Sequence, residues 1–346
     1  MMTTIKRLGP HDRQTAAAWD AFVSACPDAT FFHRAGWQRI LREVFGHDAH
    51  FLYAEQGGRI TGVLPLGHVD SLLFGSSLVS LPFAVYGGVA ATDEASAAAL
   101  EAEAQRLAQR LGVAHLELRQ RAPRHADWPA QDLYVTFRKP ILPDEQANML
   151  AIPRKQRAMV RKGIKHGLRS EIDAGSERFF ALYADNQHRH GTPPMPRRYF
   201  DALLREFGSA AEVLTVCSAD GRARSSVLSF YFRDEVLPYY AGDDESAREL
   251  AANDFKYWEL MRRSCARGLA VFDYGRSKQG TGSYAFKKNW GFEPQPLHYE
   301  YQLYRRQGVP QNNPANAKYK LLIETWRRLP LSLANWLGPF VVRNLG

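Results

Sequence analysis

The feature that most constrains the fold is a pattern that occurs twice along the chain. Tyr86–Gln120 and Tyr240–Ser277 each predict a strand, an acidic turn, a helix, a glycine and a second strand. The alternative is coincidence, because any two strand–helix–strand segments share this order. We favour an internal duplication by pattern rather than by identity, and therefore expect two similar α/β halves.

Local signals predict the elements around this repeat. In the first half we expect helices within Asp12–Phe45, a hairpin turning at Gln56–Gly58, a strand at Ser77–Pro82, a helix at Asp93–Leu111 capped by Asp93 or Thr92, and a strand at Ala114–Arg119. In the second half we expect helices at Ser176–His190, Arg197–Phe207 and Ser246–Arg267, and strands at Glu212–Ala219, Ser225–Phe232, Glu235–Tyr240 and Leu269–Ser277.

The composition is that of a globular protein with two cores. Of 346 residues, 45% are hydrophobic and 23% charged. We expect an N-terminal domain over residues 1–150, a basic linker helix over 151–170, a C-terminal catalytic domain over 171–307 and a tail over 308–346. Three dispersed cysteines predict neither disulfides nor a metal site. The lack of a signal-peptide or membrane-spanning run favours a cytoplasmic location.

The linker is strongly basic. Residues 152–169 contain seven Lys or Arg and no acid, in a chain of net charge +9. On a helix that starts after Pro153, the residues Arg154, Arg157, Arg161 and Lys165 share one face. A solvated linker is one interpretation. The other is an anionic partner, such as phosphopantetheine, a polyphosphate lipid carrier, an acidic carrier protein or tRNA.

Chemistry-bearing residues gather where the last strand of the second repeat ends. This segment contains Asp273, Arg276, Ser277, Lys278, Tyr284, Lys287 and Lys288. We expect Lys287 to stabilise an oxyanion and Asp273 to orient an amine or accept its proton, as acyl transfer to an amine requires. The alternative is that Lys287 and Lys288 form a solvated helix face. Ser277, Ser283 and Cys265 lack the local signature of a covalent nucleophile, and His188 and His190 are more typical of a polar surface than of a metal site.

The motifs Phe-Asp-Tyr-Gly-Arg-Ser-Lys (272–278), Gly-Thr-Gly-Ser-Tyr-Ala-Phe-Lys-Lys-Asn-Trp-Gly-Phe-Glu-Pro (280–294) and Gly-Thr-Pro-Pro-Met-Pro (191–196) carry a resemblance. The chain resembles the FemAB-related proteins of the PEP-CTERM/exosortase (XrtA) system, in the FemAB/FemX-like branch of the GNAT acyltransferase superfamily. This resemblance implies an α/β (α+β) fold of two tandem GNAT-like domains, each a mixed sheet flanked by helices.

The resemblance also implies an amide-forming acyl or aminoacyl transfer without a permanently bound cofactor. Phe286 and Lys287 match a Phe-Lys pair of FemX-type enzymes, which move an amino acid from aminoacyl-tRNA to a lipid-linked peptidoglycan precursor. Relatives in exosortase loci accompany acyl carrier proteins, so the donor is expected to be a carrier-protein phosphopantetheine thioester, with acyl-CoA or aminoacyl-tRNA as alternatives. We assign Lys287, Asp273 and Tyr284 to catalysis. Donor or substrate binding is assigned to Arg276, Ser277, Lys278, Phe286, Lys288, Tyr240, Arg154, Arg157 and Arg161.

The sequence departs from these relatives in two places. It has no long coiled-coil arm for tRNA, and the GNAT pyrophosphate loop is reduced to Arg248–Asn253, without glycines. A backbone without glycine approaches a pyrophosphate less closely, which argues against free coenzyme A.

The tail combines leucines and two tryptophans, Trp326 and Trp336, with basic residues. This pattern is typical of a segment lying on an anionic membrane surface, and docking onto the protein's own core is the alternative. We expect an N-acyltransferase acting on an amine of a cell-envelope polysaccharide or lipid-linked precursor. An aminoacyl-tRNA-dependent transferase and a non-catalytic, carrier-binding scaffold are the alternatives.

Overall fold

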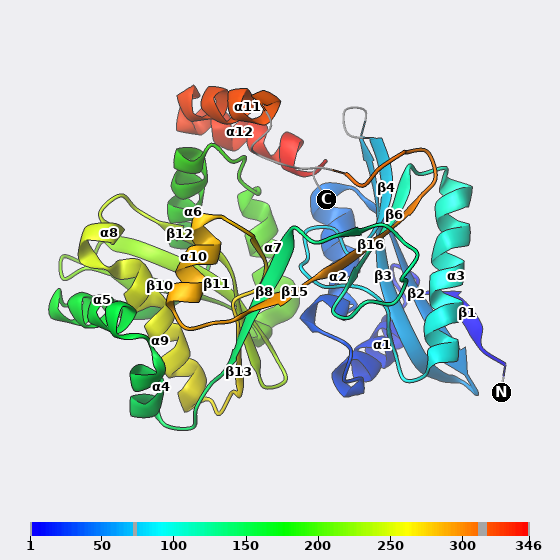
Figure 1. The fold of residues 1–346 in the computed structure, drawn as a ribbon, viewed down its shortest axis with the longest axis horizontal. Coiled ribbons are helices and arrows are strands. Elements are labelled where there is room, and N and C mark those ends of the chain that lie inside the picture. Colours follow the sequence, from blue (N-terminus) through cyan, green and yellow to red (C-terminus); the bar gives the residue numbers. More distant parts are fainter. Residues whose placement is uncertain (1, 72–74, 311–316, 345–346) are drawn as a thin grey trace. The chain divides into compact units, whose positions relative to one another are not determined.

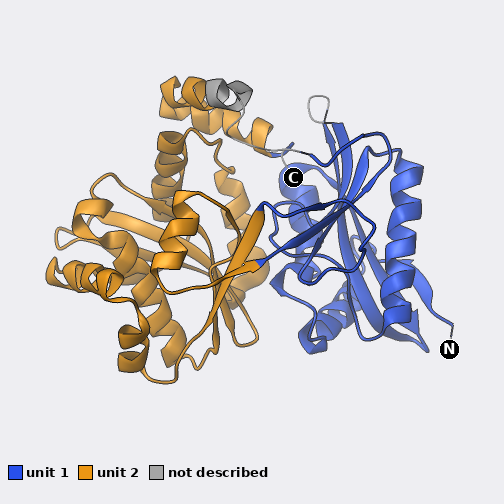
Figure 2. Ribbon diagram, in the orientation of Figure 1, with its two compact units in different colours: residues 1–133, 296–311, 343–346 blue, residues 134–295, 312–342 orange. Residues whose placement is uncertain are grey.

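The computed structural model describes residues 2–71, 75–310 and 317–344, which form two compact units (Figure 2). Unit 1 comprises residues 1–133, 296–311 and 343–346, and unit 2 comprises 134–295 and 312–342. This division differs from the predicted ranges, because residues 134–150 join unit 2 and residues 296–303 join unit 1. Both differences come from strand pairing between segments far apart in the sequence.

Unit 1 is built on a mixed sheet with the strand order β1-β2-β3-β4-β6-β16-β7, and β5 pairs with β3 (Figure 1). The strands are β1 (Thr4–Arg7), β2 (Asp48–Gln56), β3 (Arg59–Ser71), β4 (Gly75–Ser80), β5 (Ala90–Ala91), β6 (His115–Gln120), β7 (Ala130–Gln131) and β16 (His298–Leu303). Only β4 and β6 run parallel within the described part of this sheet. The connection between them contains the predicted alanine-rich helix.

The helices of unit 1 begin and end at recognisable caps. They are α1 (Arg13–Ala25), the 3₁₀ turn η1 (Phe31–His33), α2 (Gly36–Ile40), the π-helical turn η2 (Leu41–Phe45) and α3 (Glu94–Leu111). The Asp93 side chain accepts a hydrogen bond from the Ser96 N–H, and Gly112 ends α3 in the left-handed conformation, as predicted. Leucines from α3 and the sheet, including Leu52, Leu64 and Leu100, form the core between them.

Unit 2 repeats this topology. Its sheet has the order β14-β8-β13-β12-β11-β10-β9, with β15 beside β8. The strands are β8 (Tyr134–Pro140), β9 (Arg169–Asp173), β10 (Ala211–Cys217), β11 (Ala223–Phe232), β12 (Glu235–Asp243), β13 (Val271–Asp273), β14 (Ser277–Lys278) and β15 (Pro294–Pro296). Four antiparallel strands lead to a helix and then to a parallel strand, β13, as β1 to β4 lead to α3 and β6. The repeat inferred from the sequence is therefore present in the fold.

In each unit, the strand that follows the helix pairs along its other edge with a strand from a distant part of the sequence. In unit 1, the strand beside β6 is β16, which follows unit 2's sheet in the sequence. In unit 2, the strand beside β13 is β8, which precedes the rest of that sheet. These pairings explain why the units do not coincide with simple sequence ranges.

Unit 2 contains the predicted helices, one of them in two pieces, together with helices that were not predicted individually. They are α4 (Glu145–Ala151), α5 (Arg154–Lys165), α6 (Glu177–His190), α7 (Arg197–Phe207), the 3₁₀ turn η3 (Gly208–Ala210), α8 (Ala247–Leu250), α9 (Ala252–Ala266), α10 (Gly282–Asn289), α11 (Ala317–Arg328) and α12 (Leu331–Val342). The single helix predicted over Ser246–Arg267 is broken at Ala251, which has φ +57°. A non-glycine residue is strained in this region, so the sequence carries no signal for the break.

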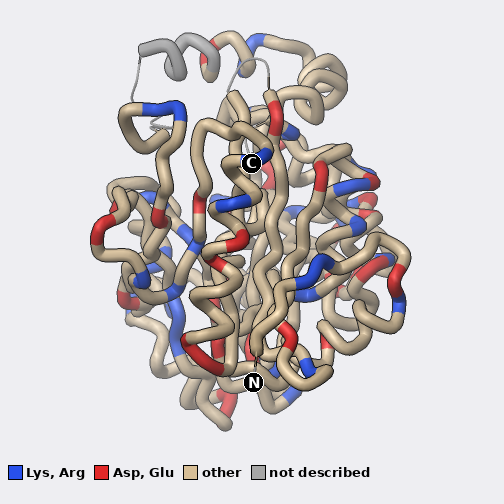
Figure 3. Tube along the Cα trace, turned by 90° about the vertical axis from the view of Figure 1, so that its right-hand side faces the viewer, with Lys and Arg blue, Asp and Glu red and all other residues tan. Residues whose placement is uncertain are grey.

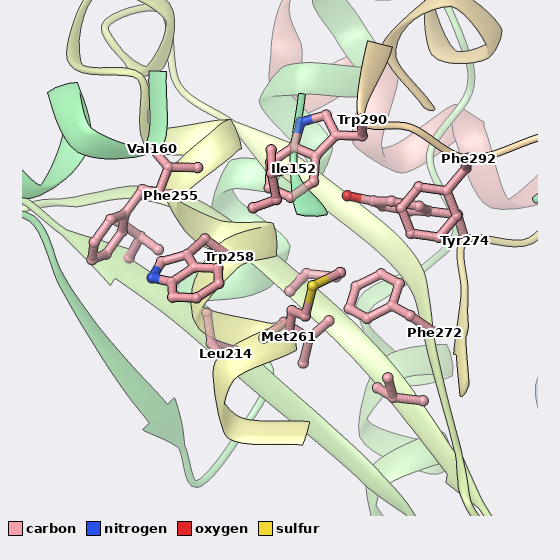
Figure 4. Packing of buried hydrophobic residues seen from close by; sticks show 14 of the residues in the cluster. Ile152, Val160, Leu214, Phe255, Trp258, Met261, Phe272, Tyr274, Trp290 and Phe292 are labelled. Atoms are coloured by element: carbon pink, nitrogen blue, oxygen red, sulfur yellow. The ribbon is translucent and has the colours of Figure 1, made fainter. Parts of the chain in front are cut away.

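Aromatic side chains dominate the core of unit 2 near the end of β13. Phe272, Tyr274, Trp290 and Phe292 lie together in this core (Figure 4). The ring centroids of Tyr274 and Phe292 are 4.6 Å apart in an edge-to-face arrangement. This packing fixes the turn after β13 against α10.

A buried histidine in unit 1 predicts a pH-dependent stability. Both ring nitrogens of His50 are buried without a hydrogen-bond partner, and burial, followed by the charge of Arg7, lowers its pKa from 6.5 to about 4 although Asp48 opposes this. The unfolded chain therefore takes up this proton first as the pH falls. The contribution of His50 to stability is complete above pH 6.5 and is lost toward pH 4, by about 3 kcal/mol.

Replacing His50 by leucine is accordingly expected to flatten the fall in unfolding free energy between pH 6.5 and 4. Urea unfolding at several pH values measures this slope. His11→Leu is the control, because His11 is exposed. An unchanged slope in His50→Leu would contradict the assignment.

Candidate active site

The candidate site begins where β13 leaves the sheet of unit 2. β13 pairs with β12 only at Glu235 and Val236, and it pairs along its other edge with β8. Beyond Val236, the β13-facing edge of β12 has no strand partner in the described part of the chain. A bulge at Tyr239, opposite the Leu228–Ser229 step of β11, further bends β12 there. The sheet therefore opens beside the turn that follows β13, residues 274–276, which we call the charged turn.

Asp273 is completely buried at this opening. Its Oδ2 lies 2.7 Å from Nη1 of Arg138 on β8, and its Oδ1 accepts hydrogen bonds from the Gly275 N–H at 2.7 Å and from the Thr136 hydroxyl at 3.3 Å. Arg138 also pairs with Glu235. The carboxylate thus joins β8 to the turn, and Arg138 links both to β12 through Glu235. Sequence reasoning missed Arg138 because no local signal connects residues so far apart.

Lys287 points from α10 into the same turn, and its side chain is only 9% exposed. Nζ lies 2.7, 3.0 and 3.1 Å from the carbonyl oxygens of Tyr274, Gly275 and Arg276. Three N–H bonds therefore meet three carbonyl acceptors. Burial lowers the pKa of Lys287 to about 7, although the charge of Asp273 raises it. A solvated helix face, the alternative for the lysine pair, describes the exposed Lys288 but not Lys287.

The remaining predicted residues around the turn lie at different depths. Arg276 is exposed and stacks over the Tyr134 ring at 4.6 Å, whereas the buried Ser277 hydroxyl has no hydrogen-bond partner among the described residues. Lys278 is partly buried. Phe286 packs against the aromatic rings of Tyr257 and Trp290 in the core of unit 2.

Tyr284 is half-buried on the first turn of α10, and its ring meets Phe137 edge-on at 5.4 Å. Its hydroxyl makes no hydrogen bond to a described residue. Among the three residues predicted to be catalytic, Tyr284 therefore has a polar group available to a reactant, whereas Asp273 and Lys287 use theirs to hold the turn.

Tyr240 lies further along β12, in a cluster of rings with Tyr183, Tyr199 and Phe200. Its hydroxyl is 3.0 Å from the hydroxyl of Tyr199, and burial raises the pKa of Tyr240 well above its usual value. The Tyr240 ring therefore packs with residues of α6 and α7 rather than with the aromatic core around the turn after β13.

A buried ion pair, which the sequence did not indicate, lies at the end of β12. Lys256 of α9 is fully buried, and its Nζ lies 2.9 Å from Oδ1 of Asp243. Asp243 also accepts a hydrogen bond from the Ser225 hydroxyl. This pair fixes α9 to the end of β12, because a buried lysine without its partner is strongly destabilising.

The basic segment forms α5, which starts after Pro153 as predicted. Its buried face packs on α9, where Gly163 allows close approach: a Cβ there would lie 2.8 Å from Cβ of Phe255. Arg154 and Arg161 are exposed, and Arg157 is partly exposed and donates to the Leu150 carbonyl. No ion pair to a described residue involves these three arginines. The basic face is therefore free to meet an anion.

Unit 1 contains a pocket of about 480 Å³ that the sequence analysis did not identify. It lies beside the Tyr86–Gly88 segment and is lined by Arg119, Arg121 and Arg124. Arg119 and Arg124 are already paired with acids. Arg121 lies over the Tyr86 ring at 5.7 Å and forms no ion pair with a described residue.

Comparison with known proteins assigns the fold. Residues 154–288 match the family model of an acetyltransferase (GNAT) domain. The whole chain is similar to a tandem GNAT protein from the clavulanic acid biosynthesis pathway, with 13% identity and a TM-score of 0.51, over 90% of this chain and 100% of that one. The chain has a tandem GNAT fold.

Other proteins share this tandem GNAT fold. The crystal structure of FemX is 14% identical with a TM-score of 0.68, over 87% of this chain and 98% of that one. The C-terminal domain of a putative lysylphosphatidylglycerol synthetase from Agrobacterium fabrum is 14% identical with a TM-score of 0.57, over 86% of this chain and 99% of that one. No curated protein matches the sequence.

Proposed function

We propose that the protein is an N-acyltransferase in which unit 2 carries out amide formation. The observation that carries this proposal is the opening between β12 and β13 beside the charged turn. An unpaired strand edge offers N–H and C=O groups to an extended ligand that contains amides, such as a phosphopantetheine arm. The match of residues 154–288 to a GNAT domain supports the same choice of unit.

In the proposed reaction, the acceptor amine attacks the thioester carbonyl and forms the C–N bond. The tetrahedral intermediate collapses with loss of the C–S bond, and the thiolate takes up the proton that the amine gives away. We assign Tyr284 to this proton transfer, because its hydroxyl makes no hydrogen bond to a described residue. Asp273 and Lys287 are assigned to positioning, because their polar atoms already hold the turn.

We further propose an acyl carrier protein thioester as the donor. The acid-free, unpaired basic face of α5 suits an acidic carrier protein. Within the segment Arg248–Asn253, Ala251 adopts a positive φ, as a glycine of a pyrophosphate loop would. Its methyl group keeps a pyrophosphate further from the backbone than a glycine would, and this disfavours free coenzyme A as the donor. Aminoacyl-tRNA is the alternative donor, and the structural similarity to FemX favours testing it.

For the acceptor we propose an amine on a cell-envelope polysaccharide or on a lipid-linked precursor. We place the protein among FemAB/FemX-like proteins of the PEP-CTERM/exosortase type. We propose that it works at the inner face of the cytoplasmic membrane. The similarity to the lysylphosphatidylglycerol synthetase domain supports an acceptor associated with lipid.

The proposal is tested by supplying purified protein with an acyl carrier protein thioester or an aminoacyl-tRNA, together with amino-sugar acceptors. Thiol release and the mass of the amide product report transfer. A product with either donor identifies the donor. Binding of carrier protein with no product from any donor would instead identify the non-catalytic scaffold.

Reversing the charge of α5 tests the donor surface. In the double variant Arg154→Glu/Arg161→Glu, we expect the KM for a carrier-protein thioester to rise about tenfold at low salt, because both side chains are exposed and unpaired. Turnover of a small pantetheine thioester should not change. Arg13→Glu/Arg59→Glu, two exposed residues of unit 1, is the matched control. Equal effects on the protein-bound and the small donor would refute docking at α5.

A further inference from the structure

Helix α12 is almost entirely apolar and contains no Lys, Arg, Asp or Glu; Figure 3 marks the charged residues along the described backbone. Twelve residues at 1.5 Å per residue span about 18 Å, well short of a bilayer core of about 30 Å. None of the described helices is long and apolar enough to cross a membrane. The apolar character of α12 therefore calls for an explanation other than a membrane span.

One face of α12 packs on the rest of unit 2. Ala334, Gly338 and Val342 recur every four residues and are buried, and α12 contacts α6. The approach is close at Gly338, where a Cβ would lie 2.6 Å from Cδ of Pro194. The preceding turn is also tied to α6, since the Leu329 carbonyl lies 2.8 Å from Nε2 of His188. Docking on the core therefore explains the small and apolar residues on the buried face of α12.

The other face of α12 presents exposed apolar side chains. Leu333, Trp336 and Phe340 are 39%, 64% and 57% exposed, and the rings of Trp336 and Phe340 lie 5.7 Å apart. With Leu331, these residues are four of the eight exposed large hydrophobic residues in the described chain. Such a concentration on one short helix marks an interaction surface, because isolated exposed apolar residues need no explanation but a contiguous aromatic patch does.

We propose that the Leu333–Trp336–Phe340 face inserts into the headgroup region of an anionic membrane. Charge favours lipid over a soluble protein partner: no acid follows Glu324 in the sequence, and the exposed Arg327, Arg328 and Arg343 flank α12. Trp is suited to this depth, because its ring is apolar and its N–H stays near water. A single short helix binds weakly, so anionic lipid and the flanking arginines are both needed for attachment.

Membrane-surface binding and docking on the core are therefore both roles of the tail, each carried by a different face of α12. The helix docks on the protein through its small residues and meets the membrane through its aromatic residues. Side chains of residues 311–322 and residues 345–346 lie outside the described part of the structure, so the assignment uses α12 and the end of α11 alone. It is independent of the proposed acyl transfer.

Flotation of the full-length protein with vesicles of phosphatidylethanolamine and phosphatidylglycerol tests this proposal. Wild-type protein is expected to float with these vesicles and to remain behind with pure phosphatidylcholine. The double variant Trp336→Ser/Phe340→Ser should lose at least tenfold in vesicle partitioning. Leu150→Ser/Ile172→Ser, which changes two exposed apolar residues elsewhere in unit 2, should float like wild type.

Three outcomes would overturn the proposal. Wild-type protein that stays in solution with phosphatidylglycerol vesicles would exclude membrane binding, and equal flotation of the α12 variant would place binding elsewhere, with the basic face of α5 as the first candidate. Light scattering that shows a wild-type dimer and a monomeric α12 variant, with no vesicle effect, would assign the face to a second copy of the chain. Thiol release with a soluble acceptor, measured in parallel, separates these results from a loss of catalysis.

Discussion

Tyr284→Phe is expected to slow amide formation about 100-fold, with little change in the KM for either substrate and no loss of stability. General acid–base catalysis contributes roughly this much, and the substitution removes only a hydroxyl that has no partner in the described structure. The ring, which packs edge-on against Phe137, is retained. Steady-state thiol release with a carrier-protein donor measures the effect, and thermal unfolding measures stability.

Lys287→Met provides the contrast for this experiment. Removing the ammonium leaves the carbonyl oxygens of Tyr274, Gly275 and Arg276 without their shared donor, so stability and transfer should fall together. A Tyr284→Phe variant with wild-type turnover would eliminate the proposed proton transfer. A Lys287→Met variant that keeps full stability but loses transfer would instead support the sequence-based prediction that Lys287 stabilises the oxyanion directly.

Asp273→Asn is expected to cost about 3 kcal/mol of unfolding free energy in unit 2. Asparagine has nearly the same shape, but it removes the charged partner that Asp273 offers to Arg138, which is only 14% exposed. Breaking a buried ion pair on one side typically costs about 3–5 kcal/mol. Urea unfolding measures the change.

A double-mutant cycle with Arg138→Gln isolates the pair. The double variant should be more stable than the sum of the single variants predicts, by at least about 1 kcal/mol. Arg222→Gln is the control, because Arg222 and Asp220 form an exposed pair that contributes little. A cost below about 1 kcal/mol for Asp273→Asn would show that the carboxylate does not hold the turn.

The sequence predicts most of the local structure because its signals are local. The cap at Asp93, the left-handed Gly112, the hairpin glycines 57 and 58 and the helix start after Pro153 act within a few residues of the element they define. The tandem α/β architecture was predictable for the same reason, since each half carries its own strand–helix–strand pattern.

What the sequence could not predict depends on distant contacts or on strain. The pairings of β8 with β13 and of β16 with β6 join residues far apart, and they move the boundaries of both units. The break at Ala251 uses a conformation that alanine disfavours. At the candidate site, the sequence identified the segment but not the burial of Lys287, which depends on three carbonyl groups of the turn.

The late position of β16 in the chain, after most of unit 2, has a consequence for synthesis and for truncation. Residues 1–133 leave the ribosome long before β16, so one backbone edge of β6 is still unpaired at that stage, and a fragment that ends there would be prone to aggregate. The same long-range pairing slows folding, because a large loop must close before β16 finds its place. Separate expression of unit 1 therefore requires β16 to be grafted back through a new linker, whereas residues 134–295 already include β8.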